Sequence, residues 1–271
     1  ESKRGRLLAT MTPLFAVAVL TYIGRMYTRT RPVVNLRWDD FVMSLAVALT
    51  IVHYGLAVYA FNLGAGRHFY YLKPPQLETV GRTLFILNII WTWCITFVKV
   101  SVTLMLYRTR GDKAWRLWLS GFMGFLVVIG IVITALHLGQ CKPVRAFWNP
   151  LIPGAKCWSN AIAVNVLHGT SAFLLVTDIV LSLLPLTFIV KLQRPRRDKI
   201  AIGLLMGLGL VASGTSIVKI IRTPILGTTK DPIWDLPDLA IWAWVELYIG
   251  IMAACIPCLK APFERLLKKT G

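Results

Sequence analysis

The chain of 271 residues contains 56% hydrophobic but only 15% charged residues, and its mean hydropathy is +0.64. A soluble domain of this size has no core large enough for so much apolar surface, which excludes a water-soluble single domain. The formal net charge of +18 leaves two partners to consider, a nucleic acid or an anionic membrane. The positions of the charges along the chain decide between them.

Seven apolar stretches approach the roughly 20 residues that a helix needs to cross the hydrocarbon core of a bilayer. They cover approximately residues 7–24, 41–63, 83–107, 117–138, 163–190, 200–221 and 239–257. The stretches are continuously apolar, whereas the strands of a membrane barrel alternate, so helices are favoured. The sequence therefore predicts an all-α fold in which residues 1–271 form a single seven-transmembrane helical bundle.

The basic residues between the stretches predict the orientation. The connections at 25–37, 108–116, 191–199 and 260–269 contain 17 Lys and Arg, against 11 in the segments at 3–6, 67–82, 142–156 and 222–230. Because short cytosolic connections are enriched in Lys and Arg, we expect a luminal or extracellular N-terminus and a cytosolic C-terminus. The charge is then a topology signal in contact with the lipid bilayer, and no nucleic acid is expected.

The five cysteines fall into three kinds of position. Cys141 and Cys157 lie in the connection between the fourth and fifth stretches, on the side expected to be oxidising, which predicts a disulfide between them. Cys94 is expected to be a buried free thiol. Cys255 and Cys258 form a C-x-x-C without the context of a redox or zinc motif, so an inert pair or palmitoylation of Cys258 is favoured.

Four ionisable residues lie within the apolar stretches, where such residues are costly and usually face the interior of the bundle. Lys99 and Asp178 each lie about 16 residues, or about 24 Å, from the luminal ends of their spans, so they are at matching depth. Lys219 and Glu246 both lie in the luminal half of the membrane, within reach of a lysine side chain. We therefore predict two ion pairs.

Polar and aromatic residues extend these positions into stripes along the helices. Because they would share faces with the charges, we predict a cavity that opens toward the lumen. We assign catalytic roles to Glu246, Lys219 and His168. The expected substrate-binding residues are Trp242, Trp244, Tyr248, Trp91, Asn88, His137 and Ser216.

Structural interpretations compete with these functional ones, because buried pairs and small polar residues also hold membrane helices together. The Lys99–Asp178 pair is expected to be structural, while Glu246, Lys219 and His168 remain open between structure and ligand binding. His53 is expected to be a satisfied core histidine. Gly203 and Gly207 form a G-x-x-x-G that predicts close helix contact. The scattered histidines give no metal site, and we expect no cofactor.

Several segments together resemble one family. They are WDDF at 38–41, GAGRHFY at 64–70, KVSVTLMLYR at 99–108, CKPVRAFW at 141–148 with Cys157, and WVE at 244–246 followed by CIPCL at 255–259. This set is similar to the fungal rhodopsin-domain family of seven-span integral membrane proteins, which includes the satratoxin-cluster membrane protein type and relatives of CFEM receptor-like proteins. A retinal Schiff base would need a lysine in the last span, and stretch 239–257 has none, so retinal is not expected.

The resemblance implies a role in fungal natural-product biosynthesis, because compact members of the family occur in such gene clusters. The first hypothesis is a membrane-embedded enzyme that cyclises a lipophilic polyketide or terpenoid intermediate, by a pericyclic or acid/base-assisted reaction, in the endoplasmic reticulum or another endomembrane. The second is a seven-span receptor-like protein that senses a hydrophobic ligand at the plasma membrane. A transporter ranks last, because no inverted repeat is visible.

Overall fold

The computed structural model describes residues 3–31, 34–108, 112–149, 152–185, 196–228 and 232–270. Over these residues the chain forms seven long α-helices, two short 3-10 helices and one pair of two-residue strands. The elements are α1 (Arg4–Thr30), α2 (Trp38–Leu63), η1 (Phe69–Tyr71), α3 (Pro74–Tyr107), α4 (Lys113–Gly139), β1 (Cys141–Lys142), η2 (Val144–Phe147), β2 (Lys156–Cys157), α5 (Asn160–Leu183), α7 (Arg196–Thr228) and α8 (Pro232–Thr270). The predicted all-α fold is confirmed.

Six of the seven long helices are long and apolar enough to cross a membrane, so the chain is an integral membrane protein. The seventh long helix, α7, is 33 residues long and is not among the six found over the described residues. Each predicted span overlaps one helix. The fifth overlaps α5, which ends at Leu183, and residues 186–190 of that prediction lie outside the described residues. The sixth predicted span, at 200–221 within α7, and the orientation remain predictions.

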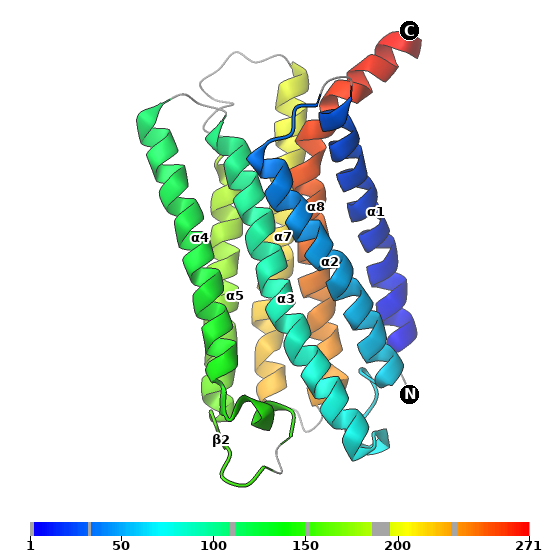
Figure 1. The fold of residues 1–271 in the computed structure, drawn as a ribbon, viewed down its shortest axis with the longest axis vertical. Coiled ribbons are helices and arrows are strands. Elements are labelled where there is room, and N and C mark those ends of the chain that lie inside the picture. The colour runs from blue at the N-terminus through cyan, green and yellow to red at the C-terminus, as the bar shows by residue number, and fades with distance from the viewer. Residues whose placement is uncertain are drawn as a thin grey trace.

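The helices run roughly parallel to one long axis, with the N-terminal end of α1 at the same end as β2 and the C-terminal end of α8 at the opposite end (Figure 1). We call the first the disulfide end. Extensive pairings join α2 with α3, α1 with α8, α7 with both α8 and α5, and α3 with α4. Because α3 also contacts α8 and α5, it forms the centre of the bundle.

Local sequence signals explain where several helices begin and end. Gly64 ends α2 in a left-handed conformation with φ of 119°, which glycine adopts without steric cost. Pro74 begins α3, where its missing N–H removes no hydrogen bond. The hydroxyl of Ser159 accepts a hydrogen bond from the backbone N–H of Ile162 at the start of α5.

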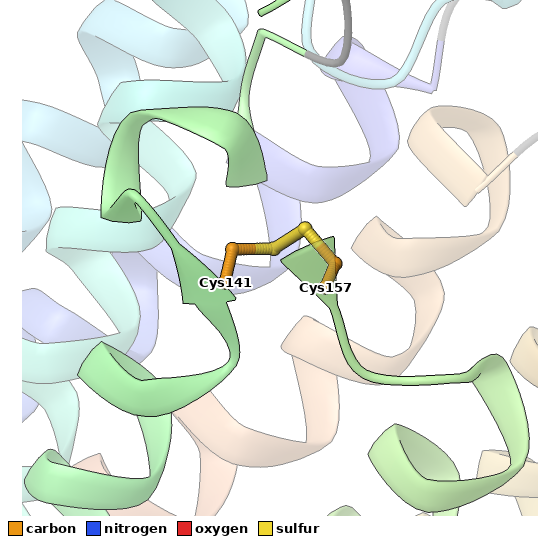
Figure 2. Close-up of a disulfide and its surroundings, with 2 residues drawn as sticks. All are labelled: Cys141 and Cys157. Atoms are coloured by element: carbon orange, nitrogen blue, oxygen red, sulfur yellow. A yellow bond between two sulfur atoms is a disulfide. The ribbon is translucent and has the colours of Figure 1, made fainter. Parts of the chain in front are cut away.

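The connection between α4 and α5 is closed by the predicted disulfide between Cys141 and Cys157, which is present (Figure 2). The same two residues are paired in the antiparallel ladder of β1 and β2. Aromatic side chains hold this loop against α3, where the ring of Phe85 lies 5.5 Å from that of Trp148. A Cβ at Gly81 would lie 2.9 Å from Trp148 Cβ. The loop therefore covers the end of α3 rather than extending freely.

Close helix contact through small residues occurs at a different glycine from the predicted ones. Gly203 and Gly207 are exposed on α7, and nothing lies within 4 Å of a Cβ built on either, so that prediction is wrong. Two residues further along α7, a Cβ on Gly209 would overlap the side chain of Ser182 on α5. The motif predicted the correct helix, α7, but the wrong glycines, because the position of α5 determines which glycines of α7 are covered.

Candidate functional site

The pair formed by Lys99 and Asp178 joins α3 to α5. The Lys99 ammonium lies 3.0 Å from Asp178 Oδ1, and it donates hydrogen bonds to the Leu174 carbonyl at 3.0 Å and the Thr177 hydroxyl at 2.8 Å. These three acceptors match the three donors of an ammonium group. Lys99 is therefore fully satisfied by α5, as a structural pair requires.

The pair formed by Lys219 and Glu246 joins α7 to α8. Glu246 is 1% exposed and Lys219 is 4% exposed. Ser216 donates a hydrogen bond to Glu246 Oε2 at 3.0 Å, and the Lys219 ammonium lies 4.8 Å from the ring centroid of Trp91 on α3. The Trp91 indole N–H in turn donates to the Ala243 carbonyl on α8 at 3.0 Å. Three helices thus meet at this pair.

We call the residues of the two buried pairs together the paired-charge site: Lys99, Asp178, Lys219 and Glu246. Two carboxylate oxygens, Asp178 Oδ2 and Glu246 Oε1, are buried and have no hydrogen-bond partner among the described residues. A buried acceptor without a partner is costly, so these atoms mark where a ligand would gain most by donating hydrogen bonds.

The histidines assigned to the site lie beside it or away from it. His168 Nε2 lies 3.0 Å from the Ile220 carbonyl, which fixes a proton on that nitrogen and attaches α5 to the residue that follows Lys219. His137 lies near the end of α4, with Nδ1 3.3 Å from the Gln140 amide. The structure therefore brings Lys219 and Glu246 together, and holds His168 next to them by a backbone contact.

The aromatic residues on α8 point in different directions. Trp242 is half-buried and precedes Glu246 by four residues, so the two share a face. Trp244 instead contacts Phe61 on α2, with ring centroids 5.7 Å apart. Tyr248 contacts Phe15 on α1 at 5.9 Å. Trp244 and Tyr248 thus belong to the interface of α8 with α1 and α2, away from the paired-charge site.

Further members of the predicted set are also placed by the structure. Asn88 is exposed on α3, whereas Thr92 and Thr96 below it are 1% and 5% exposed. Of these three polar residues on α3, only Asn88 is therefore exposed. His53 is 2% exposed, as expected for a core residue, but its Nδ1 has no hydrogen-bond partner within the described part of the chain.

Sequence reasoning missed a second buried group of charges, at the end opposite the disulfide. We call it the arginine–aspartate cluster: Arg25, Arg29, Asp39, Asp40 and Arg108. Arg25 Nη2 donates to Asp39 Oδ2 at 2.7 Å, and Arg25 Nε donates to Asp40 Oδ1 at 2.9 Å. Arg25 Nη1 also donates to the Ala254 carbonyl at 2.9 Å. These contacts join α1, α2 and α8.

In the sequence, Arg25 counts only as part of the topology signal in a connection, whereas Arg25, Asp39 and Asp40 are all at most 1% exposed. The sequence contained a signal for their burial: Arg25 directly follows one apolar stretch, and the two aspartates directly precede the next. Charges at such positions are paired when neighbouring helices close over them.

A third group of charges joins α1 to α8 at the disulfide end. The Lys3 ammonium donates to Asp238 Oδ2 at 2.6 Å and to the Trp234 carbonyl at 2.8 Å. Lys3 also lies 4.3 Å from the centroid of the Trp234 ring. α1 is therefore tied to α8 near both of its ends.

The fungal rhodopsin domain profile matches residues 24–265. The chain belongs to the fungal rhodopsin domain family. This match includes all four residues of the paired-charge site and all five of the arginine–aspartate cluster. The family assignment from the sequence motifs is confirmed.

Relatives of this fungal rhodopsin domain chain include a fugralins biosynthesis cluster protein 2 of Gibberella zeae, 26% identical over 96% of this chain and 65% of the relative. The polyenoic acids biosynthesis gene cluster protein Ba17b of Metarhizium anisopliae is 26% identical over 97% of this chain and 73% of its own length. Receptor GIN3 of Arthrobotrys oligospora is 22% identical over 94% and 62%.

The chain spans less than two thirds of the length of two of these relatives, the fugralins cluster protein and the receptor. No solved structure matches the chain.

Proposed function

We propose that the chain binds a lipophilic small molecule at the paired-charge site and acts in fungal natural-product biosynthesis. The proposed reaction is the cofactor-independent cyclisation or isomerisation of a polyketide or terpenoid intermediate. Support for the biosynthetic setting comes from the two relatives named after biosynthesis clusters. The bilayer supplies such a substrate, because lipophilic molecules partition into its hydrocarbon core.

The observation that carries the proposal is the environment of Glu246. This carboxylate is buried beside an ammonium group, and its Oε1 has no partner among the described residues. In the proposed reaction, Lys219 donates a hydrogen bond to a substrate carbonyl. Glu246 removes a proton from an adjacent carbon and returns it at another position. Both steps conserve oxidation state, and a site of low dielectric constant strengthens both interactions.

The remaining residues have supporting roles in this proposal. Trp91 positions the Lys219 ammonium through the contact with its ring, and Ser216 orients the Glu246 carboxylate by its hydrogen bond. Lys99 and Asp178 hold α3 against α5. His168 holds α5 to α7 beside Lys219, which makes it a positioning residue.

The test is product formation in a fungal host that expresses the chain together with its neighbouring biosynthetic genes. Glu246→Gln removes the base at nearly constant volume, and we expect product yield to fall by roughly a hundredfold or more. Glu78→Gln is the matched control, because Glu78 is exposed at the start of α3. A folded Glu246→Gln protein with undiminished product would refute the catalytic assignment.

A receptor is the second candidate, and similarity to Receptor GIN3 favours it. In addition, α3 and α8 contribute to both the paired-charge site and the arginine–aspartate cluster. A ligand at the paired-charge site would therefore contact helices that also reach the cluster. A ligand-dependent distance change between labels at the ends of α3 and α8 farthest from the disulfide, in the absence of turnover, would support the receptor over the enzyme.

A further inference from the structure

The arginines of the arginine–aspartate cluster differ sharply in how well their donors are used. Arg25 makes three hydrogen bonds to oxygen at 2.7 to 2.9 Å. Arg29 lies 3.5 Å from both Asp39 and Asp40, and its hydrogen bond is to the weak acceptor Cys258 Sγ, also at 3.5 Å. Arg29 Nε is buried and has no hydrogen-bond partner among the described residues. Arg29 thus has donors to spare.

Counting contacts with the described residues alone, Arg108 is the second arginine with donors to spare. At the end of α3, its Nη1 lies 3.5 Å from Asp39 Oδ1, at the outer limit of a hydrogen bond. Arg29 and Arg108 therefore approach the same carboxylate: Arg108 faces Oδ1, and Arg29 faces Oδ2, which already accepts a hydrogen bond from Arg25. Three arginines against two aspartates leave a formal charge of +1 in this cluster.

The position of the surplus charge indicates the kind of anion that would neutralise it. The side chain of Arg29 is 20% exposed and that of Arg108 is 40% exposed, whereas Arg25 is 1% exposed. The side chains of the two outer arginines are thus partly exposed. The Lys and Arg distribution predicts that this end is cytosolic, and the cytosolic leaflet carries anionic phospholipids.

We propose that Arg29 and Arg108 form a binding site for a phosphate monoester on an anionic phospholipid headgroup. Guanidinium groups bind phosphate through paired parallel hydrogen bonds. A monoester offers three free oxygens to the two guanidinium groups, whereas a phosphate diester offers two. Asp39 lies 3.5 Å from both arginines and keeps their guanidinium groups close together for the phosphate. This site is independent of the function proposed for the paired-charge site.

The test uses the purified chain in detergent and measures its thermal midpoint as lipid is added. Short-chain phosphatidic acid is the monoester probe, and short-chain phosphatidylcholine with the same acyl chains is its comparison. We expect phosphatidic acid to raise the midpoint at concentrations where phosphatidylcholine leaves it unchanged. An equal response to both lipids would overturn the proposal. A full response to inorganic phosphate alone would overturn the assignment of a lipid.

Variants locate the site. In the double variant Arg29→Gln/Arg108→Gln, we expect about tenfold more phosphatidic acid to be needed for the same shift, which corresponds to the loss of one charge-assisted hydrogen bond. Arg116→Gln is the matched control, because Arg116 is exposed near the same end and its guanidinium packs over Tyr107. An unchanged response in the double variant would overturn the site.

The single variant Arg108→Gln keeps the test decisive if the double variant does not fold. Arg108 is the most exposed member of the cluster and lies at the end of α3, so its replacement leaves the buried contacts of Arg25 in place. We expect a smaller loss of lipid response in the same direction. A folded Arg108→Gln protein with the wild-type response would count against the site.

Discussion

Lys219 on α7 and Glu246 on α8 form a buried ion pair, and the Lys219 ammonium also lies over the ring of Trp91 on α3. Each charge is stabilised by groups from another helix, so neither would be tolerated alone in a low-dielectric interior. The environment of the Glu246 carboxylate therefore depends on how these three helices pack together. This relationship leads to the first prediction.

Replacing Lys219 by Met should leave the Glu246 carboxylate buried without its cation. We expect the free energy of unfolding to fall by about 3 kcal/mol, measured as denaturation of the purified protein in detergent. The double variant Lys219→Met/Glu246→Gln should be less destabilised than the single one, because no unpaired charge remains. Lys156→Met on the exposed strand β2 is the control. Additive losses in the double variant would show that the two residues do not interact.

Replacing Arg25 by Met should destabilise the end opposite the disulfide by about 3 to 5 kcal/mol, because two buried aspartates lose their main partner. Arg25→Lys should fall between Met and wild type, since an ammonium cannot reproduce the fork of the guanidinium. The thermal midpoint measures this order. If Arg25→Met were as stable as Arg116→Met, the burial of the cluster would not matter for folding.

Reduction of the disulfide should lower stability by about 3 kcal/mol, as expected for a closed loop of this size, since its cysteines are 16 residues apart. The measurement is the thermal midpoint with and without a reductant. Cys141→Ser/Cys157→Ser should resemble the reduced wild type and should not respond to reductant. Cys258→Ser is the control and should respond as wild type does, because Cys258 is a free thiol.

Gly209→Ala should destabilise the packing of α7 on α5 by about 1 to 3 kcal/mol, because the added methyl group overlaps Ser182. Gly207→Ala makes the same chemical change on the same helix where nothing lies within 4 Å. It should be neutral or stabilising by up to about 1 kcal/mol, because alanine favours helix. The difference in thermal midpoint between the two variants tests the packing directly, and a reversed order would contradict it.

The features that followed from the sequence depend on length, composition and depth. The apolar stretches predicted the helices, since crossing a bilayer imposes a length that can be counted along the chain. Matching depth predicted which lysine could meet which carboxylate, and the structure brings Lys99 to Asp178 and Lys219 to Glu246. The disulfide followed from two cysteines in one short connection.

The features that did not follow depend on which helices become neighbours. Trp244 is two residues from Glu246, which rotates it by about 200° on a helix, and only the position of α2 reveals that this face is an interface. The burial of Arg25 and Asp39 was not predicted, because the chain alone does not show that α8 supplies the carbonyl of Ala254 to Arg25. Both cases concern tertiary contacts rather than local structure.

The double attachment of α1 to α8 restricts how a lipophilic molecule could enter the bundle from the side. Parting these helices would break the contact of Lys3 with Asp238 near one membrane surface and that of Arg25 with Ala254 near the other. By contrast, α4 meets α5 through the rings of Phe125 and Phe173, 5.3 Å apart. Two phenyl rings can separate into lipid without exposing a charge, so under the proposed function we expect a lipophilic molecule to enter between α4 and α5.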